Sequence, residues 1–110
     1  MDQVTYFAFD HDRERVQTPD GSLGFYDLLN ALRATHEEDA QAGLHPDNYR
    51  FVGAGVLALR LGIKQPSLRK QICRLNKAAP ALVENKPWEG YRLNPHRAWI
   101  VATDEIGGVW

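Results

Sequence analysis

The sequence is poor in the residues that build disulfides and metal sites. Among its 110 residues there is one cysteine, Cys73, so no disulfide can form within the chain. The four histidines are His11, His36, His45 and His96. They are scattered, and none stands at the spacing of a zinc site from another histidine or from the cysteine. No apolar run is long enough to span a membrane. We therefore expect no metal, no cofactor and no membrane contact.

The sequence also lacks recognisable catalytic motifs. It contains no glycine-rich phosphate loop, no catalytic serine motif and no paired acid and base. Asp10, Asp12 and Glu14 alternate in a turn, but a calcium loop needs more ligands. We interpret Cys73 as a small half-buried side chain beside the core rather than as a redox switch. These absences indicate a protein that is not an enzyme.

Length and composition predict one folded domain. Hydrophobic residues make up 44% and charged residues 25% of the chain, which is typical of a soluble globular protein. We expect one domain over residues 1–97, followed by a C-terminal strand and tail over residues 98–110. The start of the chain lacks the basic and apolar segments of a secretory signal. Together with the single cysteine, this predicts a cytoplasmic protein.

Charge is distributed very unevenly along the chain, although the net charge is only −1. Residues 1–59 hold four basic and ten acidic groups, whereas residues 60–97 hold nine basic and two acidic groups. A segment this basic can present a positive surface to phosphates, and the acidic half limits indiscriminate binding. The charge pattern alone is also compatible with a solvated surface.

The first forty residues predict a hairpin followed by a helix. Residues 6–9 and 15–18 are strand candidates separated by a polar turn, and Pro19, Asp20 and Gly21 form a second turn. A helix is expected to begin near Leu23, with Ser22 as its cap, and to extend toward Gly43. Its apolar residues recur at helical spacing: Phe25, Leu28, Leu29 and Leu32.

Two more helices are predicted in the basic half, with a tight turn between them. Val52, Val56 and Leu59 define the stripe of the first, which Gly62 can end in a left-handed conformation. The second begins near Pro66 and buries Leu68, Ile72 and Leu75. Pro80 stops it, because proline cannot continue a helix.

A second hairpin is expected over residues 81–84 and 91–93, and residues 99–101 are a further short strand candidate. Two short helices, a tight turn and a hairpin are the plan of a winged helix-turn-helix. Ala58, Gly62, Ile63 and Leu68 fit the small, turn and buried positions of that motif. The predicted fold class is therefore α+β, a winged helix-turn-helix with three helices, an N-terminal β-hairpin and a C-terminal β-hairpin wing.

The outward face of the third helix carries the predicted function. If its apolar stripe faces the core, Ser67, Lys70, Arg74 and Lys77 point away from it, and Arg69, Gln71 and Asn76 lie on the flanks. A helix fits the major groove, where arginine and lysine reach guanine and the amide side chains pair with adenine. An ordinary solvated helix shows the same pattern, but the turn, the hairpin and the charge polarity together favour DNA.

The tip of the second hairpin suggests further contacts. Lys86 and Arg92 are placed to reach a phosphate or the minor groove. We interpret Trp88 as packing down on the third helix, because tryptophan is usually buried.

The basic half resembles a known family. Residues 67–77 (SLRKQICRLNK), followed by Leu82-Val83-Glu84 and Gly90-Tyr91-Arg92-Leu93, resemble the effector domain of OmpR/PhoB-type response regulators. The resemblance covers residues 6–93. It implies a DNA-binding transcriptional regulator whose third helix reads the major groove. It carries over Arg69, Lys70, Arg74 and Lys77 as DNA contacts, and Lys86 and Arg92 as wing contacts.

The main hypothesis is thus a sequence-specific transcriptional regulator that binds double-stranded DNA. Its candidate DNA-binding residues are Lys64, Gln65, Ser67, Arg69, Lys70, Gln71, Arg74, Lys77, Lys86 and Arg92. The alternative is a winged-helix protein-interaction module that uses the acidic N-terminal half or the apolar C-terminal tail. The two are compatible, since such regulators bind repeated half-sites as dimers, and the tail is a candidate surface for a homodimer or a partner protein.

Overall fold

The N-terminal strands build a four-stranded sheet. In the computed structural model, which describes residues 5–19 and 21–100, β1 (Thr5–Asp10) pairs antiparallel with β2 (Arg15–Thr18), and β2 pairs with β3 (Gly21–Leu23). β6 (Ala98–Ile100) joins parallel to β1, so that the strand order is β3-β2-β1-β6. Phe7, Phe9 and Val16 are buried in the core. The predicted first hairpin and the short strand near residue 99 are confirmed.

The start of the first helix was predicted wrongly. Ser22 does not cap it, because Ser22 lies in β3 opposite Gln17. α1 (Tyr26–Gln41) begins later, after Phe25, whose φ of 68° turns the chain from the sheet into the helix. A strand of only three residues, Gly-Ser-Leu, is too short to carry a periodic signal, so the pattern missed β3. Asp20 of the predicted turn, Val101 of the last strand candidate and the tail beyond it lie outside the described residues.

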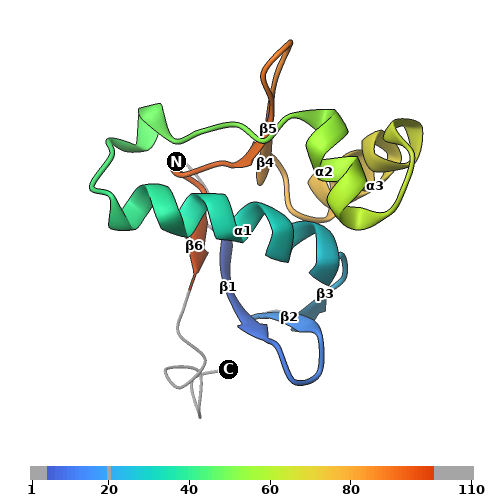
Figure 1. Ribbon diagram of the computed structural model, residues 1–110. Coiled ribbons are helices and arrows are strands. Elements are labelled where there is room, and N and C mark those ends of the chain that lie inside the picture. Colours follow the sequence, from blue (N-terminus) through green and yellow to red (C-terminus); the bar gives the residue numbers. More distant parts are fainter. Residues whose placement is uncertain (1–4, 20, 101–110) are drawn as a thin grey trace.

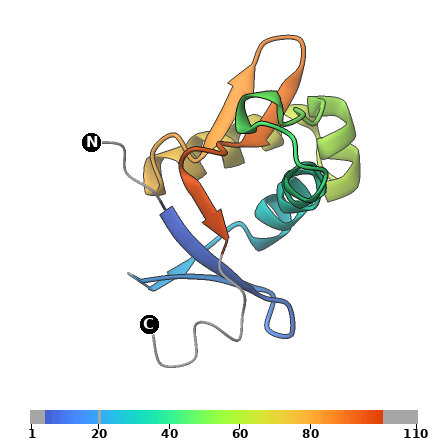
Figure 2. The same ribbon diagram turned by 90° about the vertical axis from the view of Figure 1, so that its left-hand side faces the viewer.

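α1 lies between the two sheets and packs against α2 and β5 (Figures 1 and 2). Its predicted core residues, Leu28, Leu29 and Leu32, are buried. The helix ends at Gln41, two residues before Gly43, whose φ of 75° is left-handed. Near that end the buried Asp39 carboxylate accepts hydrogen bonds from the backbone N–H of Arg50 at 2.7 Å and from its Nε at 2.8 Å. This interaction, with the 3₁₀ turn η1 (Pro46–Asn48), orders the loop after α1.

α2 (Ala54–Leu61) and α3 (Gln65–Ala78) are joined by the tight turn that the sequence predicts. Gly62 takes a φ of 64°, and Ile63 donates its N–H to the Ala58 carbonyl at 3.0 Å. Leu68, Ile72 and Leu75 are buried, as predicted.

The predicted stripe of α2 is wrong. Leu57 and Ala58 are its buried residues, whereas Val56 is exposed and Leu59 is 82% exposed. Almost every residue of α2 is apolar, so periodicity could not select its buried face. Contacts with α1 and α3 decide which face it buries.

The second hairpin consists of β4 (Val83–Lys86) and β5 (Gly90–Leu93). Val52 joins its base through two backbone hydrogen bonds to Tyr91, of 2.7 and 2.8 Å. The hairpin projects from the molecule on the side opposite the β1–β2–β3 sheet (Figures 1 and 2). The described chain is therefore an α+β fold with three α-helices and two small sheets, in agreement with the predicted class. None of its described helices combines the length and apolar character needed to cross a membrane.

Candidate nucleic-acid interface

The outer face of α3 is a continuous basic surface. Leu68, Ile72 and Leu75 face the core, and the remaining positions of the helix turn Arg69, Lys70, Arg74 and Lys77 to solvent. At 3.6 residues per turn these four side chains fall within an arc of about 140° around the helix axis. We call these four residues the basic ridge. The predicted outward orientation of Lys70, Arg74 and Lys77 is confirmed, and Arg69, which was expected on the flank, is also exposed.

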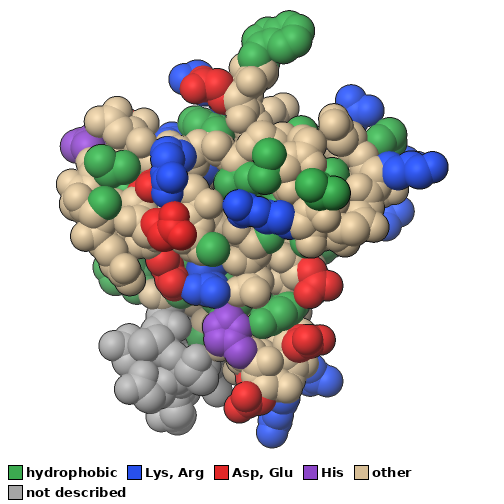
Figure 3. All heavy atoms as spheres, viewed as in Figure 1, with side chains coloured by type: hydrophobic (Ala, Val, Ile, Leu, Met, Phe, Trp, Pro, Cys, Tyr) green, Lys and Arg blue, Asp and Glu red, His purple; other side chains and the backbone are tan. Residues whose placement is uncertain are grey.

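The basic ridge is not neutralised within the described part of the chain. None of its four residues takes part in an ion pair with another described residue. Moreover, no acidic residue occurs between Asp47 and Glu84 in the sequence. Lys and Arg side chains accordingly gather at the right-hand edge of Figure 3, where α3 lies. The ridge therefore keeps its full charge for a negatively charged partner.

The polar candidates beside the ridge are also accessible. Lys64 and Gln65 begin α3 and are exposed, as is Ser67, whereas Gln71 is half-buried on the flank. The Gln65 side chain reaches back over α2, since a Cβ on Gly55 would lie 3.4 Å from its Nε2. Gln65 thus occupies the crossing between the two helices at the edge of the basic surface.

Asn76, by contrast, serves the fold. Its side-chain amide donates to the Val83 carbonyl at 3.1 Å, and its side-chain oxygen accepts from the Val83 N–H at 3.0 Å. Both polar ends of the amide are used, so Asn76 fixes the start of β4 on α3. The expectation that it pairs with a base is therefore corrected.

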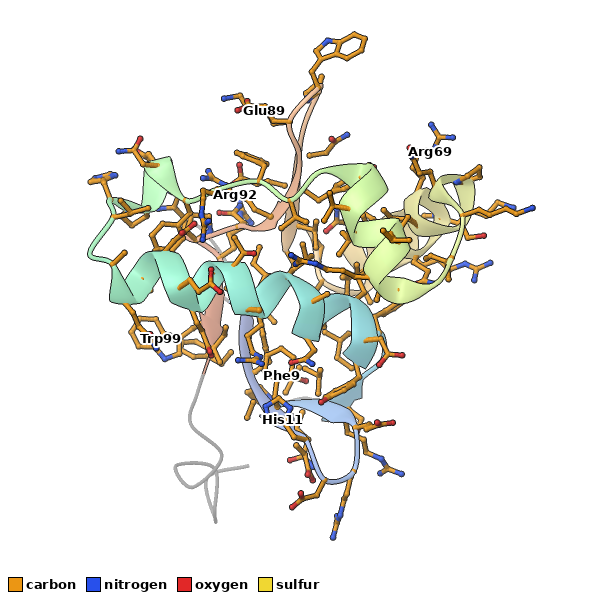
Figure 4. The ribbon with its side chains drawn as sticks, in the orientation of Figure 1. Phe9, His11, Arg69, Glu89, Arg92 and Trp99 are labelled. Carbon is orange, nitrogen blue, oxygen red and sulfur yellow. The ribbon has the colours of Figure 1, made fainter. Side chains whose placement is uncertain are left out.

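Arg92 is also a structural residue, and its assignment as a wing contact is corrected. Its exposed fraction is only 9%, and it lies inside the molecule rather than on the hairpin surface (Figure 4). Nη1 donates to the Tyr49 carbonyl at 2.7 Å, Nη2 contacts the Glu84 carboxylate at 3.3 Å, and the guanidinium lies 4.4 Å from the Phe51 ring centre. Arg92 holds the loop after α1 against the hairpin. Glu84 and Arg92 face each other across the two strands of the hairpin. Opposite charges at paired positions of a predicted hairpin were therefore the sequence signal for a structural ion pair.

The hairpin tip exposes the residue that was expected to be buried. Trp88 does not pack on α3; its exposed area is 105% of the reference value, and hydrophobic surface stands clear at the tip in Figure 3. Lys86 is exposed and forms a 2.7 Å ion pair with Glu89. Arg69 and Glu89 lie on the side of the molecule from which the hairpin projects (Figure 4). The ridge and the hairpin tip can therefore face one extended partner.

Cys73 is exposed on α3, so the expectation of a half-buried thiol is corrected. It follows Ile72 of the buried stripe by one residue, and a step of about 100° around the helix carries it to the solvent side. Its neighbours there are the residues of the basic ridge.

A cavity of about 500 Å³ lies between α1 and the β1–β6 edge of the sheet, away from the basic ridge. Phe9, His11 and Trp99 lie below α1 around it (Figure 4). His36 also lines the cavity, and its buried Nδ1 has no hydrogen-bond partner among residues 5–19 and 21–100. Burial lowers the pKa of His36, the nearby carboxylates of Glu37 and Asp39 raise it by smaller amounts, and the Arg92 charge lowers it. The sequence pattern gave no indication of this cavity.

Two histidines that are far apart in the sequence meet at Asp47. His96 Nε2 lies 2.8 Å from one carboxylate oxygen and His45 Nδ1 lies 3.5 Å from the other. The hydrogen bond with His96 is the main reason that the pKa of Asp47 is lowered. Within the described residues, no group of three or more His, Cys, Asp or Glu side chains has the arrangement of a metal site.

Comparison of the chain with protein-family models, with curated proteins and with solved structures finds no match.

Proposed function

We propose that the chain is a winged helix-turn-helix protein, similar to the OmpR/PhoB-type effector domain. In this proposal it is a cytoplasmic transcriptional regulator that binds double-stranded DNA sequence-specifically. In this proposal α3 enters the major groove, and the β4–β5 hairpin is the wing, which lies on the backbone or in the minor groove. The observation that carries the proposal is the basic ridge, which consists of four solvent-facing cations without an ion-pair partner among the described residues, on the helix beside a projecting hairpin. The proposal assigns the chain no catalytic role.

The chemistry of the ridge suits a duplex. Lysine and arginine can neutralise phosphates and release counterions, and arginine can make two hydrogen bonds to guanine in the major groove. Gln71, on the flank of the ridge, is the residue type that pairs with adenine. The acidic groups of the first half of the chain have no counterpart on α2 or α3. A duplex therefore meets positive charge when it approaches from the α3 side.

The test is a selection of binding sites from random duplexes, followed by affinity measurements over a range of salt concentrations. Lys70→Ala and Arg74→Ala should each weaken binding to the selected duplex. Each phosphate contact removed should reduce the slope of log affinity against log salt by about 1. Arg13→Ala is the matched control, because Arg13 is an exposed cation on the turn between β1 and β2. The control variant should bind like the unmodified protein.

The outcomes separate the hypotheses. Enrichment of a motif, with weaker binding by the two ridge variants and not by the control, supports the proposal. Unchanged affinity of both ridge variants places the duplex elsewhere and contradicts it. Failure to enrich any motif, with no duplex affinity at low salt, contradicts DNA binding altogether.

A protein-interaction surface is the second candidate function. Tyr6 of β1 and Trp99 of β6 are both exposed, with ring centres 6.3 Å apart. Trp99 of this aromatic pair belongs to the C-terminal strand and tail of residues 98–110, and paired exposed aromatics are typical of protein interfaces. Sedimentation of the same protein sample would reveal a homodimer. Self-association without duplex affinity favours this candidate over the first.

A further inference from the structure

The tip of the wing is a strained turn with a tryptophan at its most unfavourable position. Glu89 donates its N–H to the Lys86 carbonyl at 3.0 Å, which closes a four-residue turn with Pro87 and Trp88 at its centre. Trp88 has a φ of 71°. A proline followed by a residue with positive φ is the signature of a type II turn, in which glycine or asparagine normally occupies the second central position. A tryptophan there imposes a conformational cost on the fold.

Nothing within the described chain offsets that cost. The indole of Trp88 is fully exposed, so it contributes no burial to the stability of the core. Tryptophan carries a large apolar surface that is most often buried in a core or an interface. At this one residue the backbone strain lowers the stability of the free protein, and the exposed indole provides no burial that would offset it. Both are explained if the side chain has a partner outside the chain.

The base of the wing holds the indole in a fixed position relative to α3. A Cβ on Gly90 would lie 2.0 Å from the Val52 carbonyl oxygen, so the wing and the segment before α2 are in close backbone contact. Asn76 fixes β4 on α3 through both its hydrogen bonds to Val83. At the tip, the ion pair of Lys86 with Glu89 closes the turn. The indole is therefore presented on a braced hairpin beside the basic ridge.

We propose that Trp88 is a stacking residue that enters the minor groove and packs its indole against a base or between two bases of the duplex. The inference rests on the proposed function and deepens it. Apolar side chains at minor-groove contacts can wedge into a base step, and aromatic rings stack on bases independently of their identity. At the wing tip Lys86 is paired with Glu89, so the positive charge near Trp88 comes from the basic ridge beside the wing. A protein-binding hot spot, in contrast, normally lies within a larger apolar patch. The surroundings of Trp88 thus favour nucleic acid over a protein partner.

The decisive variant is Trp88→Gly, because it should change folding and binding in opposite directions. Glycine relieves the left-handed strain, so the variant should resist urea at least as well as the unmodified protein. Loss of the stacking contact should weaken binding to the selected duplex about 5- to 150-fold. The salt dependence should stay unchanged, since no phosphate contact is lost. Trp88→Phe, which retains an aromatic ring, should keep most of the affinity.

A fluorescence measurement tests the contact directly. The protein contains three tryptophans, so Trp99→Phe and Trp110→Phe leave Trp88 as the only indole. Its emission should be quenched as the selected duplex is added, and 2-aminopurine at the contacted step should brighten as it unstacks. No quenching, together with equal duplex affinity of Trp88→Gly and the unmodified protein, would overturn the inference while leaving DNA binding intact. Loss of self-association in Trp88→Gly, with unchanged duplex affinity, would also overturn it and would assign the indole to a protein interface. If the unmodified protein has no duplex affinity, the proposed function itself fails, and the inference fails with it.

Discussion

Substitution of Gly90 by alanine should detach the β4–β5 hairpin from the body of the protein. A Cβ at this position would lie 2.0 Å from the Val52 carbonyl oxygen and 2.6 Å from its carbon. Both atoms belong to backbone that is hydrogen-bonded to Tyr91, the next residue. A side-chain rotation cannot relieve the overlap, so the two backbone segments have to separate.

The magnitude follows from two contributions. Gly90 has a φ of +122°, a conformation that costs a non-glycine residue about 1–3 kcal/mol. Separation of the segments breaks the two hydrogen bonds between Val52 and Tyr91, each worth roughly 0.5–1.5 kcal/mol. Gly90→Ala should therefore lower the free energy of unfolding by about 2–6 kcal/mol.

Gly21→Ala is the matched control for the backbone contribution. Gly21 has a similar φ of +131°, but a Cβ there would have nothing within 4 Å. It should lose only the conformational part, about 1–3 kcal/mol. Urea denaturation followed by circular dichroism measures both variants against the unmodified protein. Equal stability of Gly90→Ala and Gly21→Ala would refute the assignment of Gly90 as the contact that seats the wing.

Two further predictions concern buried charge and pH. Arg92→Met should destabilise the fold by about 2–4 kcal/mol, because it leaves the Tyr49 carbonyl and the Glu84 carboxylate without their partner. Urea denaturation measures this loss of stability. For the folded variant, the slope of log duplex affinity against log salt should be unchanged, because Arg92 contacts no phosphate. A reduced slope would contradict its structural role. Burial lowers the pKa of His36 in the folded protein, so the unfolded chain takes up the proton first as the pH falls. The contribution of His36 to stability is therefore complete above a pH of about 6.5, and it is lost as the pH falls toward the folded pKa. In His36→Phe the decline of unfolding free energy from pH 7 to pH 5 should be smaller than in the unmodified protein, and equal declines would exclude His36 as a source of the pH dependence.

The elements that the sequence predicted well share a local cause. α3 has three core residues at helical spacing, a proline in its first turn and a proline beyond its end, so its register and its outward face follow from a single repeat. Gly62 marks the point between α2 and α3 where the backbone needs a positive φ. These signals depend on residues within a few positions of each other, and a sequence pattern can detect them.

The failures of sequence reasoning arise where a residue's surroundings come from distant segments. α2 is apolar on most of its surface, and its packing partners select Leu57 and Ala58 over Val56 and Leu59. Arg92 has the sequence position of a wing cation, but the loop after α1 encloses it with carbonyl groups. Residue type alone could not distinguish that role from a phosphate contact.

The amino-acid sequence by itself determined the order of the three helices and the two hairpins, the basic face of α3 and the concentration of positive charge in the second half of the chain. These properties depend on spacing along one helix and on charge counts, which require no knowledge of the neighbours. Only the tertiary structure decided that the Arg92 side chain is buried, that Trp88 is exposed at a strained turn, and that a cavity opens between α1 and β6. Each of these results depends on how chain segments far apart in sequence pack against one another, because burial and accessibility are properties of that packing.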